Sequence, residues 1–121
     1  MHLEHVNLTV SDLDRSVAFY SDLLDLHVRW KGQLEPGRRG AHVGDDRCYL
    51  ALFEATAPEP TEVDYLRPGL NHFGFVVDDL DAARARALEL GATIHIEPVY
   101  EPGRRLYLTD PDGNEVELVA Y

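Results

Sequence analysis

The sequence has little cysteine and no long apolar run, and both shortages exclude classes of protein. Cys48 is the only cysteine among the 121 residues, which rules out an internal disulfide and a zinc site built from several cysteines of one chain. No apolar stretch approaches the roughly 20 residues of a membrane-spanning helix. The first residues lack the basic start and apolar run of a signal peptide. We therefore expect a cytoplasmic protein with no membrane partner.

Basic residues are also scarce. The chain has 11 lysines and arginines but 22 aspartates and glutamates, which gives a formal net charge of −11. Such a surface repels nucleic acid and anionic lipid, so neither is expected as a partner. The chain is 45% hydrophobic and 27% charged, which is typical of a globular protein. Its length corresponds to one ordinary domain.

The chain repeats itself. Residues 3–14 read LEHVNLTVSDLD and residues 70–81 read LNHFGFVVDDLD, with six identities in twelve positions. The string EPGRR occurs at 35–39 and again at 101–105. Two matches in the same order at nearly the same spacing indicate an internal duplication.

The duplication predicts one domain made of two modules. We place module one at 1–54, a proline-containing linker at 55–69 and module two at 70–121. In each module an alternating apolar segment predicts a strand, and apolar residues at helical spacing then predict a helix. Three short strand-like runs follow the helix, near 26–32, 40–44 and 47–54 in module one and near 93–97, 104–109 and 114–120 in module two. Each module is therefore predicted to be βαβββ.

Strand alternation places three potential metal ligands on the strand faces that point away from the helices. The apolar residues of each strand must face the helix, so His5, His72 and Glu117 are expected on the helix-free faces. If the two modules pack symmetrically, the two histidines lie near the pseudo-twofold axis. Two histidines and one carboxylate bind Fe, Mn, Co, Ni or Zn as a divalent ion and leave positions open for substrate or water.

Three segments then resemble a known family. Residues 5–20 follow H-x-x-L-x-V-x-D-L-x-x-S-x-x-F-Y, residues 71–80 follow N-H-x-x-F-x-V-x-D-L, and residues 107–118 follow Y-x-x-D-P-D-G-N-x-x-E-L. Together they resemble the vicinal oxygen chelate superfamily, which includes glyoxalase I, fosfomycin-resistance thiol transferases, extradiol dioxygenases, methylmalonyl-CoA epimerase and bleomycin-resistance proteins. The resemblance covers essentially the whole chain and is specific for the superfamily rather than for a branch.

The resemblance implies an α+β fold in which two βαβββ modules form a cup-shaped curved mixed β-sheet with the helices outside. It also implies one divalent metal ion on His5, His72 and Glu117. Ala51 falls where glyoxalase I and the epimerase have a fourth ligand, and alanine cannot ligate. An open three-ligand site is therefore expected, as in fosfomycin-resistance enzymes and extradiol dioxygenases. The sequence also departs from those two branches: Asn7 replaces the fosfomycin enzymes' threonine, and His95 comes too early for the dioxygenase catalytic histidine.

Further residues are expected to line the cup. Tyr107 matches a tyrosine of the fosfomycin enzymes and is the catalytic candidate, although it could equally be a packing aromatic. The substrate-binding candidates are Asn7, Thr9, Tyr49, Ala51, Phe53 and, from the EPGRR loops, Arg104 for an anionic group. The alternative for the loop arginines is pairing with surface acids. Glu115 is expected to be exposed rather than to act as a base, and His42 is expected to be an ordinary residue.

The function implied is that of a metal-dependent enzyme, a lyase, transferase or ring-cleaving dioxygenase, that stabilises an oxyanion or enolate on a small oxygen-chelating substrate. The main alternative is a metal-free protein that binds or sequesters a small molecule, such as an antibiotic, as bleomycin-resistance proteins do. A sensor that binds without turnover is a third possibility. Small chains of this superfamily commonly dimerise, so we expect a homodimer, and the linker permits His5 of one chain to meet His72 and Glu117 of another.

Overall fold

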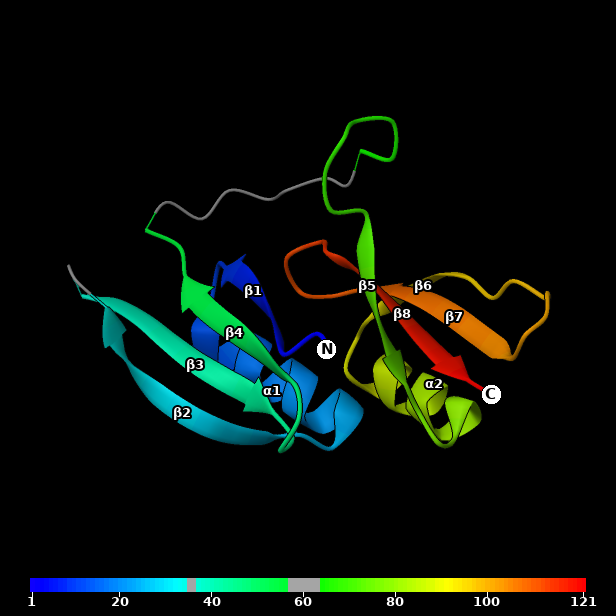
Figure 1. Cartoon of the computed structure of the whole chain (residues 1–121), viewed down its shortest axis with the longest axis horizontal. Helices are drawn as coiled ribbons and strands as arrows, with labels where there is room; N and C mark the ends of the chain where they lie inside the picture. The colour runs from blue at the N-terminus through cyan, green and yellow to red at the C-terminus, as the bar shows by residue number, and fades with distance from the viewer. Residues whose placement is uncertain (35–36, 57–63) are drawn as a thin grey trace. The chain divides into compact units, whose positions relative to one another are not determined.

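The computed structural model describes residues 1–34, 37–56 and 64–121. The chain divides into two compact units, Met1–Glu59 and Pro60–Tyr121. Each unit has the predicted order βαβββ (Figure 1). The unit boundary falls inside the predicted linker 55–69, although residues 57–63 of that linker lie outside the described residues, as do Glu35 and Pro36.

Unit 1 contains a four-stranded mixed sheet in the order β1-β4-β3-β2. Its elements are β1 (His5–Val10), α1 (Leu13–Leu24), β2 (His27–Leu34), β3 (Arg38–Gly44) and β4 (Tyr49–Glu54). The outer strand β1 runs parallel to β4, whereas β4, β3 and β2 are antiparallel neighbours. The parallel pair requires a crossover, and α1 begins that connection.

Unit 2 repeats this arrangement in the order β5-β8-β7-β6. Its elements are β5 (His72–Val76), α2 (Leu80–Glu89), β6 (Thr93–Ile96), β7 (Arg104–Thr109) and β8 (Glu115–Ala120). The outer strand β5 is parallel to β8, and the remaining pairs are antiparallel. The predicted α+β class and the two βαβββ modules are thus confirmed.

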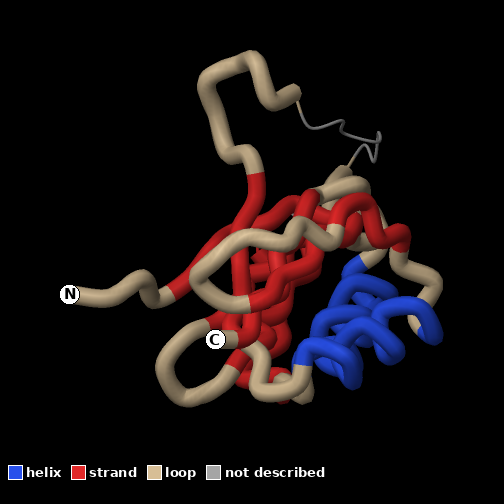
Figure 2. Tube along the Cα trace, turned by 90° about the vertical axis from the view of Figure 1, so that its right-hand side faces the viewer, coloured by secondary structure: helices blue, strands red, loops and turns tan. Residues whose placement is uncertain are grey.

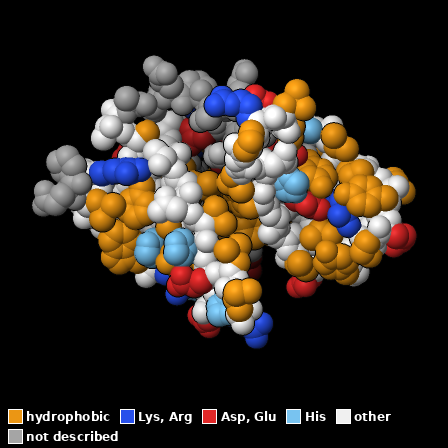
Figure 3. Space-filling view, turned by 45° about the horizontal axis from the view of Figure 1, so that its top comes forward, with side chains coloured by type: hydrophobic (Ala, Val, Ile, Leu, Met, Phe, Trp, Pro, Cys, Tyr) orange, Lys and Arg blue, Asp and Glu red, His pale blue; other side chains and the backbone are white. Residues whose placement is uncertain are grey.

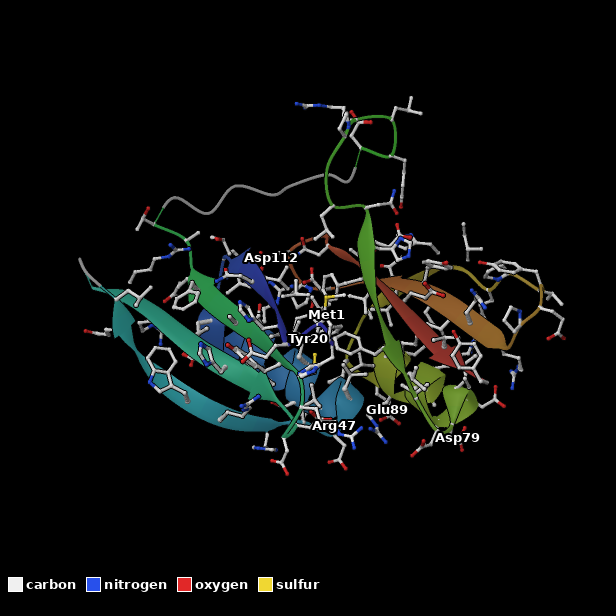
Figure 4. The ribbon with its side chains drawn as sticks, in the orientation of Figure 1. Met1, Tyr20, Arg47, Asp79, Glu89 and Asp112 are labelled. Atoms are coloured by element: carbon white, nitrogen blue, oxygen red, sulfur yellow. The ribbon has the colours of Figure 1, made fainter. Side chains whose placement is uncertain are left out.

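Both helices begin at an acidic cap residue. Asp12 accepts a hydrogen bond from the backbone N–H of Arg15, and Asp79 does the same for Ala82. Each carboxylate satisfies a first-turn N–H that has no partner within the helix. Figure 4 shows Asp79 at the start of α2. None of the described helices is long and apolar enough to cross a membrane.

In each unit the helix covers one face of its sheet (Figure 2). The side chains that fill the space between helix and sheet differ in size between the units. From α1 come Tyr20 and Leu23, which are almost completely buried, whereas α2 contributes Ala83 and Ala87 with Leu80 at its start. The opposite, helix-free face of each sheet is left for other contacts.

The edge strands β2 and β6 each carry an irregularity. Pairing along β2 shifts between Val28 and Trp30, and pairing along β6 shifts between Ile94 and Ile96. Arg29 and His95 are the residues passed over. An extra residue of this kind is a β-bulge, which bends a strand and increases its twist.

Candidate functional site

The helix-free face of unit 2 brings together two of the predicted ligands. His72 lies at the start of β5 and Glu117 lies in the middle of the neighbouring strand β8. The His72 Nε2 and Glu117 Oε2 atoms are 3.2 Å apart. Both side chains are largely buried, so little solvent screens their interaction.

A neighbouring amide fixes the protonation pattern of His72. The Asn71 Oδ1 atom lies 2.6 Å from His72 Nδ1. An amide oxygen can only accept, so Nδ1 carries the ring proton in this arrangement. Nε2 then faces a carboxylate oxygen, and this contact is favourable only if a proton or a metal cation lies between the two atoms.

His5 in unit 1 has the same local arrangement. Its Nδ1 lies 2.7 Å from Oε2 of the preceding residue, Glu4. The His5 ring also stacks on Tyr49 at 5.0 Å between ring centres, with 19° between the planes. A histidine that ligates a metal through one nitrogen commonly donates the other N–H to a carboxylate or carbonyl oxygen. Glu4 and Asn71 therefore play equivalent parts in the two units.

The three predicted ligands are divided between the two units. The described residues contain no group of three or more His, Cys, Asp or Glu side chains that could hold a metal ion. Unit 2 supplies two donors and unit 1 supplies one. The set of His5, His72 and Glu117 around one ion therefore remains a prediction.

Tyr107 on β7 adjoins the His72–Glu117 pair. Its ring meets the His72 ring edge-on, with 5.2 Å between the centres. Burial raises the pKa of Tyr107 to about 12, and a hydrogen bond with Tyr100 and the negative charge of Glu117 add to this. The phenol therefore stays protonated at neutral pH and can donate a hydrogen bond to an anion on this face.

Arg105 belongs to the second EPGRR string but was not among the site residues selected from the sequence. Its Nη1 lies 3.4 Å from Glu117 Oε1 and 3.3 Å from the Tyr100 hydroxyl, and its guanidinium lies 4.4 Å from the centre of the Tyr100 ring. Arg104, the residue chosen from the sequence, faces the helix side instead and bonds through two nitrogens to Asp81 of α2. Leu106 and Leu108 are buried toward the helix. Because side chains alternate along a strand, this pattern alone would have placed Arg105 on the helix-free face.

Glu115 corrects a second expectation. It was expected to be exposed, but only 9% of its surface is accessible. Burial raises the pKa of this carboxyl group because the charged form is poorly solvated. Glu115 pairs with His72 in the register of β5 and β8 and lies on the same face as Glu117.

The helix-free face of unit 1 is aromatic rather than ionic. Strand pairing places the predicted lining residues there, namely Asn7, Thr9, Tyr49, Ala51 and Phe53. His42, which was expected to be ordinary, lies on this face with its ring centre 4.5 Å from that of Tyr49 and 4.9 Å from that of Trp30. Its chain neighbours Ala41 and Val43 are buried on the helix side, so the His42 side chain points to the helix-free face. Figure 3 shows histidine side chains among hydrophobic ones.

Strand register matches the two faces position by position. His42 pairs with Ala51 in unit 1, as Tyr107 pairs with Glu117 in unit 2. The strand register does not align the two EPGRR strings residue by residue. It makes Arg39, the last residue of the first string, equivalent to Arg104, the fourth residue of the second. Both of these arginines bond to an aspartate in the first turn of their helix.

Comparison with known proteins supports the resemblance inferred from the sequence. Residues 2–118 match the family described as the Glyoxalase/Bleomycin resistance protein/Dioxygenase superfamily. The glutathione transferase FosA of Serratia marcescens is 36% identical over 96% of this chain and 78% of its own length. The catechol-2,3-dioxygenase of Bacillus subtilis is 30% identical over 98% of this chain, which spans only 41% of that protein.

Solved structures show the same fold. A glyoxylase/bleomycin resistance protein/dioxygenase domain from Frankia sp. superposes with a TM-score of 0.85, at 28% identity, over 99% of this chain and 97% of its own. An E126Q mutant of the fosfomycin resistance protein FosX from Listeria monocytogenes superposes with a TM-score of 0.79, at 21% identity, over 98% and 90% of the two chains. That mutant is complexed with Mn(II) and a dihydroxypropylphosphonic acid.

Proposed function

Because the chain belongs to the Glyoxalase/Bleomycin resistance protein/Dioxygenase superfamily, we propose that it is a divalent-metal-dependent enzyme that acts on a small oxygen-chelating substrate. The metal ligands in this proposal are His5, His72 and Glu117, and the metal is Fe, Mn, Ni, Co or Zn. Relatives named as a transferase and a dioxygenase support an enzymatic role. The Mn(II) complex of a protein with the same fold supports a divalent ion.

One observation carries the proposal: Nε2 of His72 lies 3.2 Å from an oxygen of Glu117, while Asn71 holds the opposite ring nitrogen. A ring nitrogen and a carboxylate oxygen held this close by a packed sheet fit a shared cation. His5, held at Nδ1 by Glu4, supplies a donor of the same kind from unit 1. We propose a homodimer, in which exchange of modules between chains would bring such donors together.

The surrounding residues have separate roles. A divalent ion bound by this set supplies a Lewis acid that stabilises negative charge on a chelated substrate oxygen. Tyr107 donates a hydrogen bond to that oxygen. Arg105 orients Glu117 through a charge-assisted hydrogen bond. Because Ala51 offers no donor at the position that matches Glu117, coordination positions stay open to substrate, which favours a transferase or dioxygenase over a glyoxalase I or epimerase.

Metal content tests the proposal directly. Purified protein is stripped with a chelator, exposed in turn to Fe, Mn, Ni, Co and Zn, and measured by elemental analysis. We expect one ion per pair of units, and we expect His72→Ala to lose it. His27→Ala is the matched control, because His27 is an exposed residue at the start of β2, and it should retain full occupancy. Wild-type protein that takes up none of the five metals would overturn the proposal.

A second candidate function follows from the aromatic face of unit 1. A protein that binds or sequesters a small organic molecule, as the bleomycin-resistance alternative requires, needs such a face but no metal. It would retain ligand in metal-stripped protein and in the His72→Ala variant, and it would show no turnover. The enzyme proposal requires that turnover disappear with the metal.

A further inference from the structure

The helix-free face of unit 1 carries a continuous set of rings across all four strands. From β1 to β2, His5 contacts Tyr49, Tyr49 contacts His42, and His42 contacts Trp30. Phe53 lies 6.5 Å from Trp30 and 6.4 Å from His42 between ring centres. We call Trp30, His42, Tyr49 and Phe53 the aromatic face.

Two glycines set the orientation of the outer rings. A Cβ atom added to Gly40 would lie 2.4 Å from Cε1 of Phe53, and one added to Gly32 would lie 2.3 Å from Cζ2 of Trp30. The two rings therefore occupy the space that side chains at these paired positions would fill. The two rings thus lie against the sheet instead of pointing away from it. Trp30 remains partly exposed whereas Phe53 is buried, so Trp30 is the ring that can meet a flat partner.

Positive charge lies at both ends of the aromatic face. The Arg38 guanidinium is 5.5 Å from the Phe53 ring centre, and the Arg29 guanidinium is 4.7 Å from the Tyr49 ring centre. Arg38 Nε donates to the Glu54 backbone oxygen, and one Nη2 hydrogen goes to Thr9 Oγ1. A guanidinium has five N–H donors, so these two fixed bonds orient Arg38 and leave donors for an anion.

Arg29 is the weaker anion partner of the two because acids share its surroundings. The pKa of Glu4 is lowered mainly by its hydrogen bond with His5 and, to a smaller extent, by Arg29. Asp45 is also within electrostatic reach of Arg29. Among the described residues Arg38 forms no ion pair with an acid, and the carboxylate of Glu54 bonds to Arg39 instead.

We propose that the aromatic face binds a planar aromatic carboxylate, with its ring on Trp30 and its carboxylate on Arg38. The proposal rests on the proposed function only in treating the bound molecule as a substrate. Stacking recognises the flat ring, and the guanidinium recognises the planar anion through two parallel hydrogen bonds. In a chain with a net charge of −11, a cationic end on an aromatic surface selects such a ligand against most others.

Trp30 reports on this binding because it is the only tryptophan in the chain and remains 39% exposed. Metal-stripped protein is titrated with benzoate while the fluorescence of Trp30 is followed, and equilibrium dialysis measures bound benzoate independently. Cyclohexanecarboxylate matches the charge without the flat ring, and benzamide matches the ring without the charge. We expect saturable benzoate binding and at least about tenfold weaker binding of both comparators.

Substitutions at Arg38 sharpen the test. Arg38→Gln should weaken benzoate binding about tenfold and leave benzamide unchanged, because only the ionic hydrogen bonds are removed. Arg38→Lys keeps the charge without the planar fork and should lose less. Arg84→Gln is the charge-matched control, because Arg84 pairs with Glu97 on unit 2, and it should bind as wild type does. Melting curves establish that each variant is folded.

The opposite results overturn the inference. They are equal binding of the three probes, no binding of benzoate by either method, or wild-type affinity in Arg38→Gln. Trp30 emission that changes with protein concentration but not with benzoate would instead make the aromatic face a contact between copies of the chain. Since the protein is metal-free throughout, failure here leaves the metal-uptake experiment unaffected, and failure of metal uptake leaves this titration unaffected.

Discussion

Units 1 and 2 have the same backbone order and strand pairing, yet their helix-free faces differ in chemistry. At matched positions Ala51 corresponds to Glu117 and His42 corresponds to Tyr107. Unit 1 presents rings flanked by arginines, whereas unit 2 presents a histidine–carboxylate pair with a buried arginine beside it. Only the histidines at the starts of β1 and β5 are shared.

This difference shows how a duplicated fold can divide one task. Helix-facing positions must stay apolar in both units, because they form the buried core. The helix-free positions are not part of that core, so their residues can differ between the two units. On our proposals, unit 2 holds most of the metal set and unit 1 recognises the organic part of the substrate.

The largest expected effect tests the contrast between the two helices. Tyr20 is fully buried, and Tyr20→Ala should reduce the free energy of unfolding by about 3–5 kcal/mol, because it leaves a large cavity. Leu80→Ala should cost about 2 kcal/mol, since Leu80 lies at the end of a helix that packs mainly through alanines. Urea denaturation followed by circular dichroism measures both values. Equal losses would show that the two helices stabilise their sheets equally.

Glycine substitution tests the contrast between the two faces. A methyl group at Gly40 meets the Phe53 ring at 2.4 Å, so Gly40→Ala should destabilise the protein by about 1–3 kcal/mol and disturb Trp30 fluorescence. Gly74→Ala in unit 2 meets nothing closer than 3.4 Å and should change stability by less than about 0.5 kcal/mol. A tolerated Gly40→Ala with unchanged fluorescence would mean that the glycine does not position the ring.

The likeness of the two histidines can be tested through the residues that hold them. Asn71→Ala and Glu4→Ala each remove the hydrogen-bond partner of a histidine Nδ1. Each should weaken metal affinity by about tenfold, the lower end of the effect seen for such supporting residues. Competition with a chelating dye measures the affinity. If only Asn71→Ala has an effect, His5 does not ligate the metal.

The smallest effect concerns the equivalent ion pairs. Arg39 bonds to Glu54 and Asp14, and Arg104 bonds to Asp81. Arg39→Gln should therefore lower the melting temperature more than Arg104→Gln, and added salt should shrink both effects.

The same pairs predict a pH dependence. The hydrogen bond from Arg39 lowers the pKa of Glu54, and that from Arg104 lowers the pKa of Asp81. A carboxyl group whose pKa is lowered by folding stabilises the protein above its unfolded-state pKa, and this contribution is lost as the pH falls through the folded value. The difference in melting temperature between wild type and each variant should thus be present at pH 7 and vanish in acid. A difference that persists in strong acid would contradict an ionic origin.

The sequence predicted the fold because hydrophobic alternation and helix caps are local signals. Val6, Leu8 and Val10 fix which side of β1 faces the helix, and Asp12 fixes where α1 starts. The same alternation placed His72 and Glu117 on one face. These signals depend on neighbours in the chain, which is why they need no tertiary information.

The remaining features depend on contacts between distant segments. Arg104 was chosen from the EPGRR loops for an anionic group, whereas the strand register places Arg105 on the helix-free face. Burial of Glu115 depends on packing around β8, which its exposed-looking sequence context does not reveal. His42 appears ordinary until strand pairing brings it between Tyr49 and Trp30.

The irregular edges of the two sheets have a consequence for how the protein behaves at high concentration. An outer strand with free backbone groups is a template on which other chains can build ribbons and fibrils. In both β2 and β6 the ladder is broken after the second residue, and a polar side chain, Arg29 or His95, lies at the break. Straight strand-on-strand growth is therefore discouraged at both of these borders.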